Sequence, residues 1–343
     1  MLRDWVAAQA AACETLGSPM YADILIRVAA DLDGGGPCAN LLAPFAEEGA
    51  DSALALRLMG SVHRLVLERR AGSLATFYPS VGGRWDSDAG WAAFLELLSD
   101  QPQLIAAWLR RPPQTNEVGR SAALMGALLS LPTSARLPVR LHEIGASAGL
   151  NLLLDHFTFR DHLGKSFASA RAEVVLEPAW SGRPGAPWPS LRIVERIGCD
   201  LYPIDPRSTD GRLALTAYVW ADQRERLERL RGALAVAAWE EVEVRRESAV
   251  AFVDRLTLEP GTTTVLWHSV MWQYLSAEDQ NSVLGKLEEL GQRTTQNAPL
   301  AVISLEPTKH VFEVVVRLWL AGTQTRTVLG TAPGHGLPVA WLS

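Results

Sequence analysis

The chain has 343 residues, of which 48% are hydrophobic and 20% are charged, and its formal net charge is -6. This composition excludes a disordered or fibrous chain, and at roughly 150 residues per domain the length predicts about two domains. General nucleic-acid binders usually carry a basic stripe, and the negative charge argues against one, so we expect no nucleic-acid partner.

The first part of the chain predicts helices only. Ser18 is a favourable N-cap and Pro19 a favourable first helical residue, so a helix is expected to start there. Apolar residues recur at helical spacing in three further segments, 53–70, 88–98 and 102–110. Because no alternating apolar pattern occurs before residue 138, we predict an all-helical cap domain over residues 1–135.

From residue 136 onward, strands alternate with helices. Parallel strands are predicted at 139–144, 192–199, 242–246, 263–268 and 300–305, with helices at 213–238 and 277–290 and a closing antiparallel hairpin at 314–320 and 326–329. Such alternation is typical of a parallel, right-handedly wound sheet. We therefore predict an α/β fold with a mostly parallel, Rossmann-like domain over 136–343, carrying an insertion at about 157–190.

The most informative segment runs from Glu143 to Asn151, with the sequence E-I-G-A-S-A-G-L-N. It predicts a strand, a turn of small residues and a helix start. Ligands of open α/β sheets bind just beyond the carboxyl ends of the strands, and a helix start offers unpaired N–H groups. The dinucleotide fingerprint G-x-G-x-x-G fails here, because residue 147 is Ser and residue 150 is Leu.

Two alternatives explain this turn without a cofactor. Gly145–Gly149 matches the nucleophile elbow G-x-S-x-G, which would make Ser147 a hydrolase nucleophile with His335 as its base. Against this, everything upstream is predicted helical and no oxyanion-forming His-Gly-Gly segment precedes the turn. The other alternative is a tight strand-to-helix turn that serves the fold alone.

The third interpretation is a binding site for S-adenosylmethionine. Rossmann-like methyltransferases begin with an acid-x-Gly-x-x-x-Gly turn on the first strand, which Glu143, Gly145 and Gly149 fit. The acid would hold the methionine ammonium, and the glycines would admit the carboxypropyl chain. Ser147 and Asn151 lie in the same segment and are further cofactor-binding candidates.

Asp200 ends the next predicted strand of the sheet. It resembles the carboxylate with which methyltransferases accept both ribose hydroxyls, and charged hydrogen bonds of that kind contribute roughly 1.5–3 kcal/mol each. The alternative is that Asp200 only caps a turn.

With these segments in view, the chain resembles, over nearly its whole length, a bacterial family known as domain of unknown function 2332, which is built on a methyltransferase-like Rossmann domain. The resemblance rests on Phe77–Ser80, Gln114–Arg120, Glu143–Asn151, Asp200–Asp205, Val219–Gln223 and His268–Ser269. It implies a fold and a cofactor class, S-adenosylmethionine, and no particular reaction.

The chain departs from the family pattern in two places. Pro113 stands where a polar residue is usual before Gln114, and Arg246–Ala249 replaces a Gly-Asp-Ala after the third strand. In methyltransferases that Asp often reads the adenine amine. Ser248 or Glu247 can take its place, and Ser248 is our candidate.

Substrate-binding candidates lie in two other segments. Asn116, Glu117 and Arg120 can form a lid over the site, with Arg120 binding a carboxylate or phosphate, or they can simply be a capped, ion-paired helix start. His268 and Ser269 are the catalytic candidates, His268 as general base. Four residues beyond His268, Trp272 would wall the pocket or pack in the core.

Taken together, these patterns predict S-adenosylmethionine-dependent methyl transfer to a small molecule. The alternatives are a catalytically silent, methyltransferase-like ligand-binding protein and, third, a Ser147 hydrolase. The widely spaced Cys13, Cys38 and Cys199 indicate a reducing cytoplasm and no metal site. The absence of a signal-peptide pattern or long apolar run predicts no membrane partner. The sequence predicts no oligomeric state.

Overall fold

The computed structural model describes residues 1–49, 52–167, 173–309 and 311–342. Its chain forms two compact units: Met1–Thr115 with Ser208–Glu228, and Asn116–Arg207 with Arg229–Ser343. We call them the helical unit and the sheet unit. We predicted a domain boundary at residue 135. In the structure the boundary lies after Thr115, and the helical unit also includes Ser208–Glu228. Neither unit is therefore one continuous stretch of chain.

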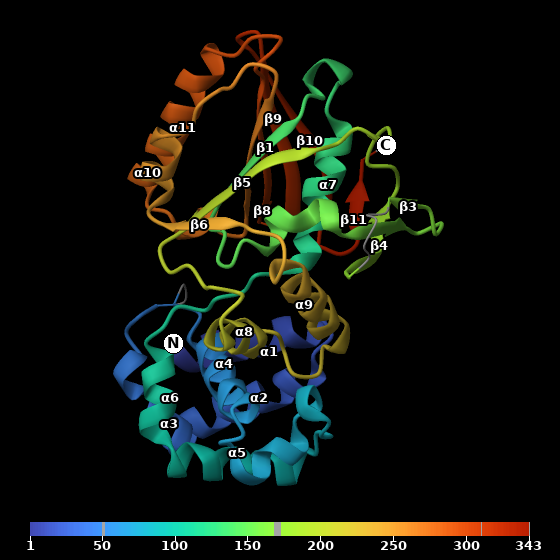
Figure 1. The fold of residues 1–343 in the computed structure, drawn as a ribbon. Coiled ribbons are helices and arrows are strands. Elements are labelled where there is room, and N and C mark those ends of the chain that lie inside the picture. The colour runs from blue at the N-terminus through green and yellow to red at the C-terminus, as the bar shows by residue number, and fades with distance from the viewer. Residues whose placement is uncertain (50–51, 168–172, 310, 343) are drawn as a thin grey trace. The chain divides into compact units, whose positions relative to one another are not determined.

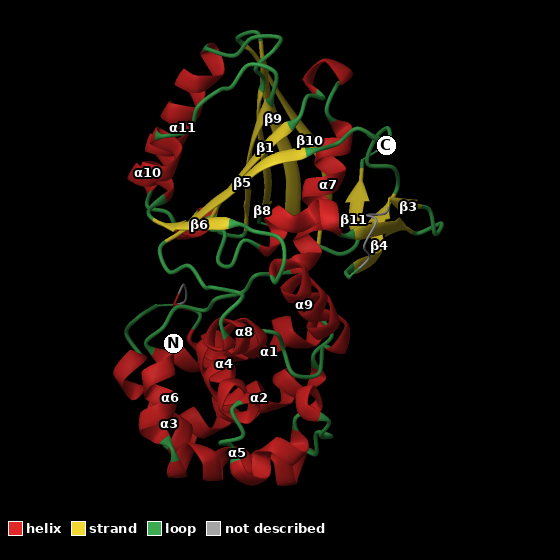
Figure 2. Ribbon diagram, in the orientation of Figure 1, coloured by secondary structure: helices red, strands yellow, loops and turns green. Residues whose placement is uncertain are grey.

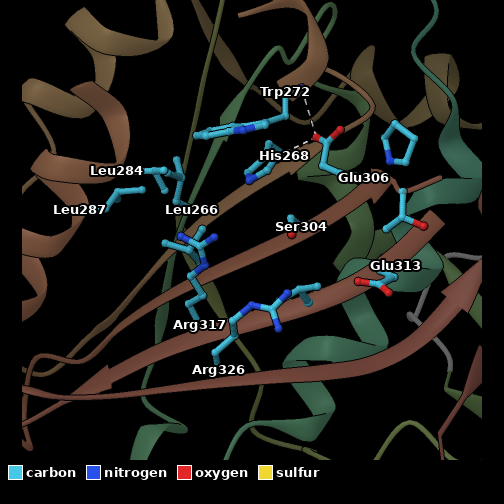
Figure 3. Close-up of a pocket in the computed structure, with 14 residues that line it drawn as sticks. Leu266, His268, Trp272, Leu284, Leu287, Ser304, Glu306, Glu313, Arg317 and Arg326 are labelled. Carbon is cyan, nitrogen blue, oxygen red and sulfur yellow. Dashed lines mark hydrogen bonds and ion pairs between the residues drawn. The ribbon is translucent and has the colours of Figure 1, made fainter. Parts of the chain in front are cut away.

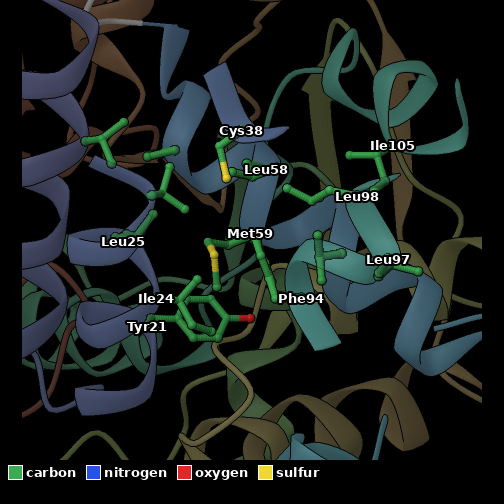
Figure 4. Close-up of a cluster of buried hydrophobic side chains, with 14 of the residues drawn as sticks. Tyr21, Ile24, Leu25, Cys38, Leu58, Met59, Phe94, Leu97, Leu98 and Ile105 are labelled. Atoms are coloured by element: carbon green, nitrogen blue, oxygen red, sulfur yellow. The ribbon is translucent and has the colours of Figure 1, made fainter. Parts of the chain in front are cut away.

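The helical unit is built around α4 (Leu54–Leu67), a helix that is buried on nearly all sides. Its helices are α1 (Leu2–Thr15), α2 (Pro19–Gly34), α3 (Pro37–Leu42), α4 (Leu54–Leu67), α5 (Ser87–Asp100), α6 (Pro102–Leu109) and α8 (Thr209–Ala217). Leu58 and Val62 of α4 are fully buried and pack in one apolar cluster with Leu25 and Phe94 (Figure 4). The Asp86 carboxylate caps the start of α5.

A long-range cap explains why residues 208–228 belong to the helical unit. Ser18 is the N-cap residue of α2 as predicted, but its hydroxyl donates to Asp222 at 2.5 Å. Asp222 in turn accepts a hydrogen bond from the Met20 amide at 3.1 Å, so the carboxylate of a distant residue caps the helix. Trp220, close by in the chain, is buried in the same apolar cluster. These contacts break the single helix predicted over 213–238 into α8 and α9 (Arg224–Ala237).

The sheet unit contains one mixed sheet, in which 11 strands are described (Figures 1 and 2). Their order is β3-β2-β4-β11-β10-β9-β8-β7-β1-β5-β6. The parallel part comprises β6 (Glu243–Arg246), β5 (Ile193–Asp200), β1 (Val139–Ile144), β7 (Thr263–Ser269) and β8 (Leu300–Pro307). Strands β9 (Phe312–Leu320) and β10 (Thr323–Ala332) then continue it antiparallel, as the predicted hairpin requires.

The predicted insertion at 157–190 extends this sheet. It forms β2 (Thr158–Asp161), β3 (Ser166–Phe167) and β4 (Val175–Ser181). The C-terminal strand β11 (Val339–Trp341) pairs with both β10 and β4, and this pairing joins the insertion to the rest of the sheet.

Helices cover both faces of the parallel strands. On one face lie α10 (Ala249–Asp254) and α11 (Ala277–Gln292), side by side in Figure 1, and they share an apolar cluster with Leu266 and Val302. On the other side α7 (Ser121–Ser130) packs against β8 and β9. Among the described residues, no helix combines the length and apolarity that crossing a bilayer requires.

Candidate functional site

The turn after β1 has an unusual backbone. Gly145, Ser147 and Gly149 all have positive φ, at 70°, 53° and 71°. A positive φ is uncommon for a residue other than Gly, so Ser147 must be held there by its neighbours. The Ala146 amide donates to the Cys199 carbonyl at 2.9 Å, which ties the turn to the end of β5. The predicted α-helix start is instead a 3₁₀ helix, η7 (Leu150–His156).

The two glycines of the turn face side chains of this same chain. A Cβ on Gly149 would lie 2.7 Å from Val242 Cγ1, and one on Gly145 would lie 2.9 Å from Met271 Cβ. Packing and positive φ together therefore require glycine at both positions. The sequence interpretation, in which the missing side chains admit a ligand, is not needed to explain either glycine.

Asp200 joins the ends of β5 and β1. Its Oδ2 accepts a hydrogen bond from the Ser147 amide at 2.9 Å, and its Oδ1 accepts one from the Tyr202 amide at 2.8 Å. The turn-capping alternative is thus realised. Each carboxylate oxygen has a second lone pair, so the arrangement leaves acceptor capacity for a ligand hydroxyl.

Glu143 is buried near the end of β1, just before the turn. Its Oε1 accepts from Asn151 Nδ2 at 3.5 Å, and Asn151 Oδ1 accepts from the Ser121 hydroxyl at 2.8 Å. No donor lies within hydrogen-bond distance of its Oε2 among the described residues, but the Trp267 indole N–H is close enough to lower the pKa of this carboxyl. Burial raises the pKa of Glu143 to about 8; the Asn151 hydrogen bond and the nearby Arg120 charge act in the opposite direction.

The predicted lid residues belong to the sheet unit. Asn116 Oδ1 accepts from the Leu150 amide at 2.9 Å, so Asn116 binds the turn directly. Glu117 Oε1 accepts from the Gly119 amide at 3.1 Å and caps the short helix η5 (Val118–Arg120). Arg120 donates from Nε to the Gly334 carbonyl at 3.0 Å. Asn116 and Arg120 are thus both placed by the fold near the network of Glu143.

Ser248 lies at the end of β6 and is exposed. Its hydroxyl accepts from the Ala251 amide at 3.2 Å and caps α10. The preceding Glu247 amide donates to the Asp200 carbonyl at 3.2 Å, so Ser248 lies next to the strand end that carries Asp200.

His268 lies in a second group of polar residues, on β7. Its Nδ1 is 2.7 Å from Glu306 Oε1, and the Trp272 ring stacks on the imidazole with centroids 5.0 Å apart. Glu306 Oε1 also accepts from the Met271 and Trp272 amides at 3.3 and 3.4 Å. The chain reaches these positions through Val270, whose φ of 52° is rare for a β-branched residue.

A pocket of about 180 Å³ adjoins this group (Figure 3). His268, Trp272 and Glu306 line one end, at the carboxyl ends of β7 and β8. Leu266, Leu284, Leu287, Val302 and Val315 supply apolar walls, and Ser304, Pro307, Thr308, Glu313, Arg317 and Arg326 complete the lining. The two arginines were not among the residues selected from sequence.

The two polar groups lie on opposite faces of the sheet. Glu143 is the register partner of Trp267, and side chains alternate along a strand, so Trp267 and Ser269 face the side of Glu143 while His268 faces the pocket. We selected His268 and Ser269 together as catalytic candidates. Because their side chains face opposite sides of the sheet, they do not act at one point. Met271 connects the groups, because it lies against Gly145 and its amide donates to Glu306.

Among the described residues, no three His, Cys, Asp or Glu side chains are grouped to hold a metal ion. The geometry defines an α/β protein with polar side chains gathered at the carboxyl ends of its parallel strands. Over residues 3–341 the chain matches the family described as "Uncharacterized protein conserved in bacteria (DUF2332)", and it belongs to that family. No curated protein and no solved structure matches it.

Proposed function

We propose that the protein binds S-adenosylmethionine at the turn between β1 and η7 and transfers its methyl group to a small molecule. The observation that carries this proposal is the pair of acids at neighbouring strand ends, Glu143 on β1 and Asp200 on β5, on either side of one glycine-containing turn. The five parallel strands support it, because their order by position in the chain is third, second, first, fourth, fifth, as in doubly wound nucleotide-binding sheets.

The buried carboxylate of Glu143 suits the ammonium of the cofactor. Its Oε2 lacks a donor among the described residues, and an unpaired buried acceptor is costly. A nearby cation favours the charged form of a carboxyl group and lowers its pKa. We expect Glu143 to ionise when it accepts the ammonium, and Asp200 to accept the ribose hydroxyls with its remaining lone pairs.

When bound, S-adenosylmethionine supplies a methyl group already activated by the sulfonium. What remains for the protein is to align the acceptor and exclude water. His268 faces the other side of the sheet from Glu143, so it can remove a proton only from an acceptor that reaches past the carboxyl end of β7. Its Nδ1 is occupied by Glu306, so Nε2, which has no described partner, is the nitrogen open to the acceptor.

One observation favours the silent alternative, a ligand-binding protein without chemistry. Met271 covers the side of Gly145 on which a Cβ would point. A ligand must therefore approach the turn from another side, or Met271 must move.

Calorimetry with S-adenosylmethionine and S-adenosylhomocysteine tests the proposal. We expect the wild type to bind both and Glu143→Ala to bind S-adenosylmethionine about 10-fold more weakly or worse. Glu289→Gln, which removes an exposed acid from α11, is the matched control and should bind as the wild type does. Lack of binding by the wild type would refute the proposal.

Transfer of labelled methyl from S-adenosylmethionine to a bacterial small-molecule extract then separates the two functions. A labelled product supports the methyltransferase. Cofactor binding without any product supports the silent protein.

A further inference from the structure

The pocket beside His268 ends in two arginines. Arg317 of β9 and Arg326 of β10 are direct partners in the antiparallel register, and both line the pocket. Figure 3 shows them on neighbouring strands beyond Ser304, with His268, Trp272 and Glu306 at the opposite end. The pocket thus has an acid–base pair and a second acid, Glu313, the register partner of Glu306, at one end and two guanidinium groups at the other.

These arginines face each other without an acid between them. No ion pair or hydrogen bond of either side chain is found in the described part of the chain, whereas Arg160 of the same sheet pairs with Glu177. Burial lowers the pKa of Arg317, and the charge of Arg326 lowers it further, while Glu288 of α11 acts in the opposite direction. Like charges directly opposite each other on adjacent strands are destabilising.

The topology explains why the arginines face a cavity. Strand β8 ends at Pro307 and β9 begins at Phe312, so the chain between them is too short for a crossover helix. Leu284 and Leu287 of α11 form the apolar wall over Leu266 and Val302. Arg317 is half-buried and Arg326 is exposed. Because low-dielectric walls strengthen the field of a charge, they strengthen the attraction of an anion to Arg317 more than to Arg326.

We propose that Arg317 and Arg326 together bind the anionic group, a carboxylate or a phosphate, of a small molecule whose other end lies at His268 and Glu306. Two guanidinium groups present planar donor pairs that match either group. As a statement about the methyl acceptor this rests on the proposed function; anion binding by itself does not.

The span of the pocket limits the size of that molecule. His268 pairs with Ser304, and Arg317 pairs with Val302, which precedes Ser304 by two residues in β8. Two strand spacings and two residues of rise separate the Cα atoms of His268 and Arg317 by about 12 Å. Side chains extend into that distance, so the ligand is a compact metabolite and not a polymer.

Binding of inorganic phosphate and of malonate tests the anion site, measured by calorimetry at constant ionic strength with chloride as the balancing anion. We expect the wild type to bind at least one of them, and the double variant Arg317→Gln/Arg326→Gln to bind it about 10-fold more weakly or worse. Arg192→Gln, which removes one positive charge from an exposed position before β5, should bind as the wild type does. Phosphate and malonate together distinguish the two anion classes.

Urea denaturation of the wild type and the double variant shows whether a loss of anion binding comes from a loss of stability. Removing two facing like charges should leave the double variant at least as stable as the wild type, so loss of binding will not reflect unfolding. Undetectable binding of both anions by the wild type, or undiminished binding by the double variant, overturns the proposal. Binding of S-adenosylhomocysteine is measured on the same samples. If the wild type binds an anion but not S-adenosylhomocysteine, only the proposed methyltransferase is refuted. If it binds S-adenosylhomocysteine but neither anion, only the anion site is refuted.

Discussion

The Asp200 carboxylate holds the Ser147 amide at 2.9 Å, although the two residues lie 53 positions apart in the chain. The bond joins the end of β5 to the turn after β1 and fixes Ser147 in its left-handed conformation. A single side chain therefore connects the two strand ends at which the cofactor is proposed to bind. Removal of the Asp200 carboxylate should therefore lower both the stability of the fold and the affinity for the cofactor.

Asp200→Ala should lower the free energy of unfolding by about 1–3 kcal/mol, because two backbone amides lose a charged acceptor. It should also weaken binding of S-adenosylhomocysteine about 10-fold or more. Urea denaturation and calorimetry below the unfolding transition measure the two effects. If the folded variant keeps wild-type affinity, Asp200 serves the turn alone.

Because of Glu143, the free energy of unfolding should fall as the pH rises from about 5 to about 8. Burial raises the pKa of this carboxyl from an ordinary value of 4.5 to about 8, so the folded state holds a proton that the unfolded state has released. Its contribution to stability is full below pH 4.5 and is lost as the pH rises through about 8. The loss between pH 5 and pH 8 should be on the order of 3 kcal/mol.

Glu143→Gln removes this titration while keeping an acceptor for Asn151. Urea denaturation should show the variant and the wild type close in stability at pH 5 and the variant more stable at pH 8. Equal slopes of stability against pH in both proteins would contradict the raised pKa.

His63 makes the helical unit sensitive to acid. Burial lowers the pKa of this imidazole from 6.5 to about 4, and its ring nitrogens bond the Ala217 carbonyl and the Ser80 hydroxyl. The unfolded state takes up a proton first, so stability is lost as the pH falls from 6.5 towards 4, by about 3 kcal/mol. His63→Gln should flatten this dependence in urea denaturation between pH 4.5 and 7. A variant with an unchanged slope would show that other groups, such as the buried His142, dominate.

Much of the sheet could be predicted, because the parallel strands are buried apolar segments with turn signals at their ends. Val139–Ile144 and Leu300–Leu305 were predicted to be strands, and both lie in the parallel part. The helix break near residue 218 could not be predicted, since the local pattern continues and only the contact between Ser18 and Asp222 ends it. Such long-range contacts leave no mark in a local pattern.

The residues of the candidate site also fall into those that the sequence could indicate and those that it could not. Strand ends and glycine turns identify Glu143, Asp200 and His268 from sequence, because any parallel sheet brings such positions to one edge. Arg317 and Arg326 gave no such signal, since the hairpin register that pairs them is set by the sheet. Likewise, the separation of His268 and Ser269 onto two faces depends on β7 extending through Ser269, one residue beyond the predicted strand.

The hydrolase alternative makes its own prediction at Ser147. A nucleophile elbow presents its Ser hydroxyl at an exposed sharp turn. Ser147 has the positive φ of a sharp turn but is only 5% exposed. We expect no labelling of the wild type by a fluorophosphonate probe, with a known serine hydrolase as positive control. Labelling that disappears in Ser147→Ala would favour the hydrolase over the methyltransferase.

Glu306 should hold the backbone that follows β7. One of its oxygens accepts from the Met271 and Trp272 amides and contacts His268, directly after the left-handed Val270. In Glu306→Ala these amides lose their acceptor, and Trp272 is then held by the Gln280 side chain, which donates to its carbonyl at 3.1 Å, and by packing against the apolar cluster under α11. Hydrogen exchange at Met271 and Trp272 should accelerate about 10-fold or more, as expected for loss of a bond to a charged group.

The matched control is Glu313→Ala, which removes an acid from the same pocket that bonds neither amide. Exchange at Met271 and Trp272 should stay at the wild-type rate in that variant, and exchange along β1 should be unchanged in both. Equal acceleration in both variants would mean that the pocket responds to lost negative charge in general. Unchanged exchange in Glu306→Ala would mean that the turn is held by the sheet, and Glu306 would then retain only its contact with His268.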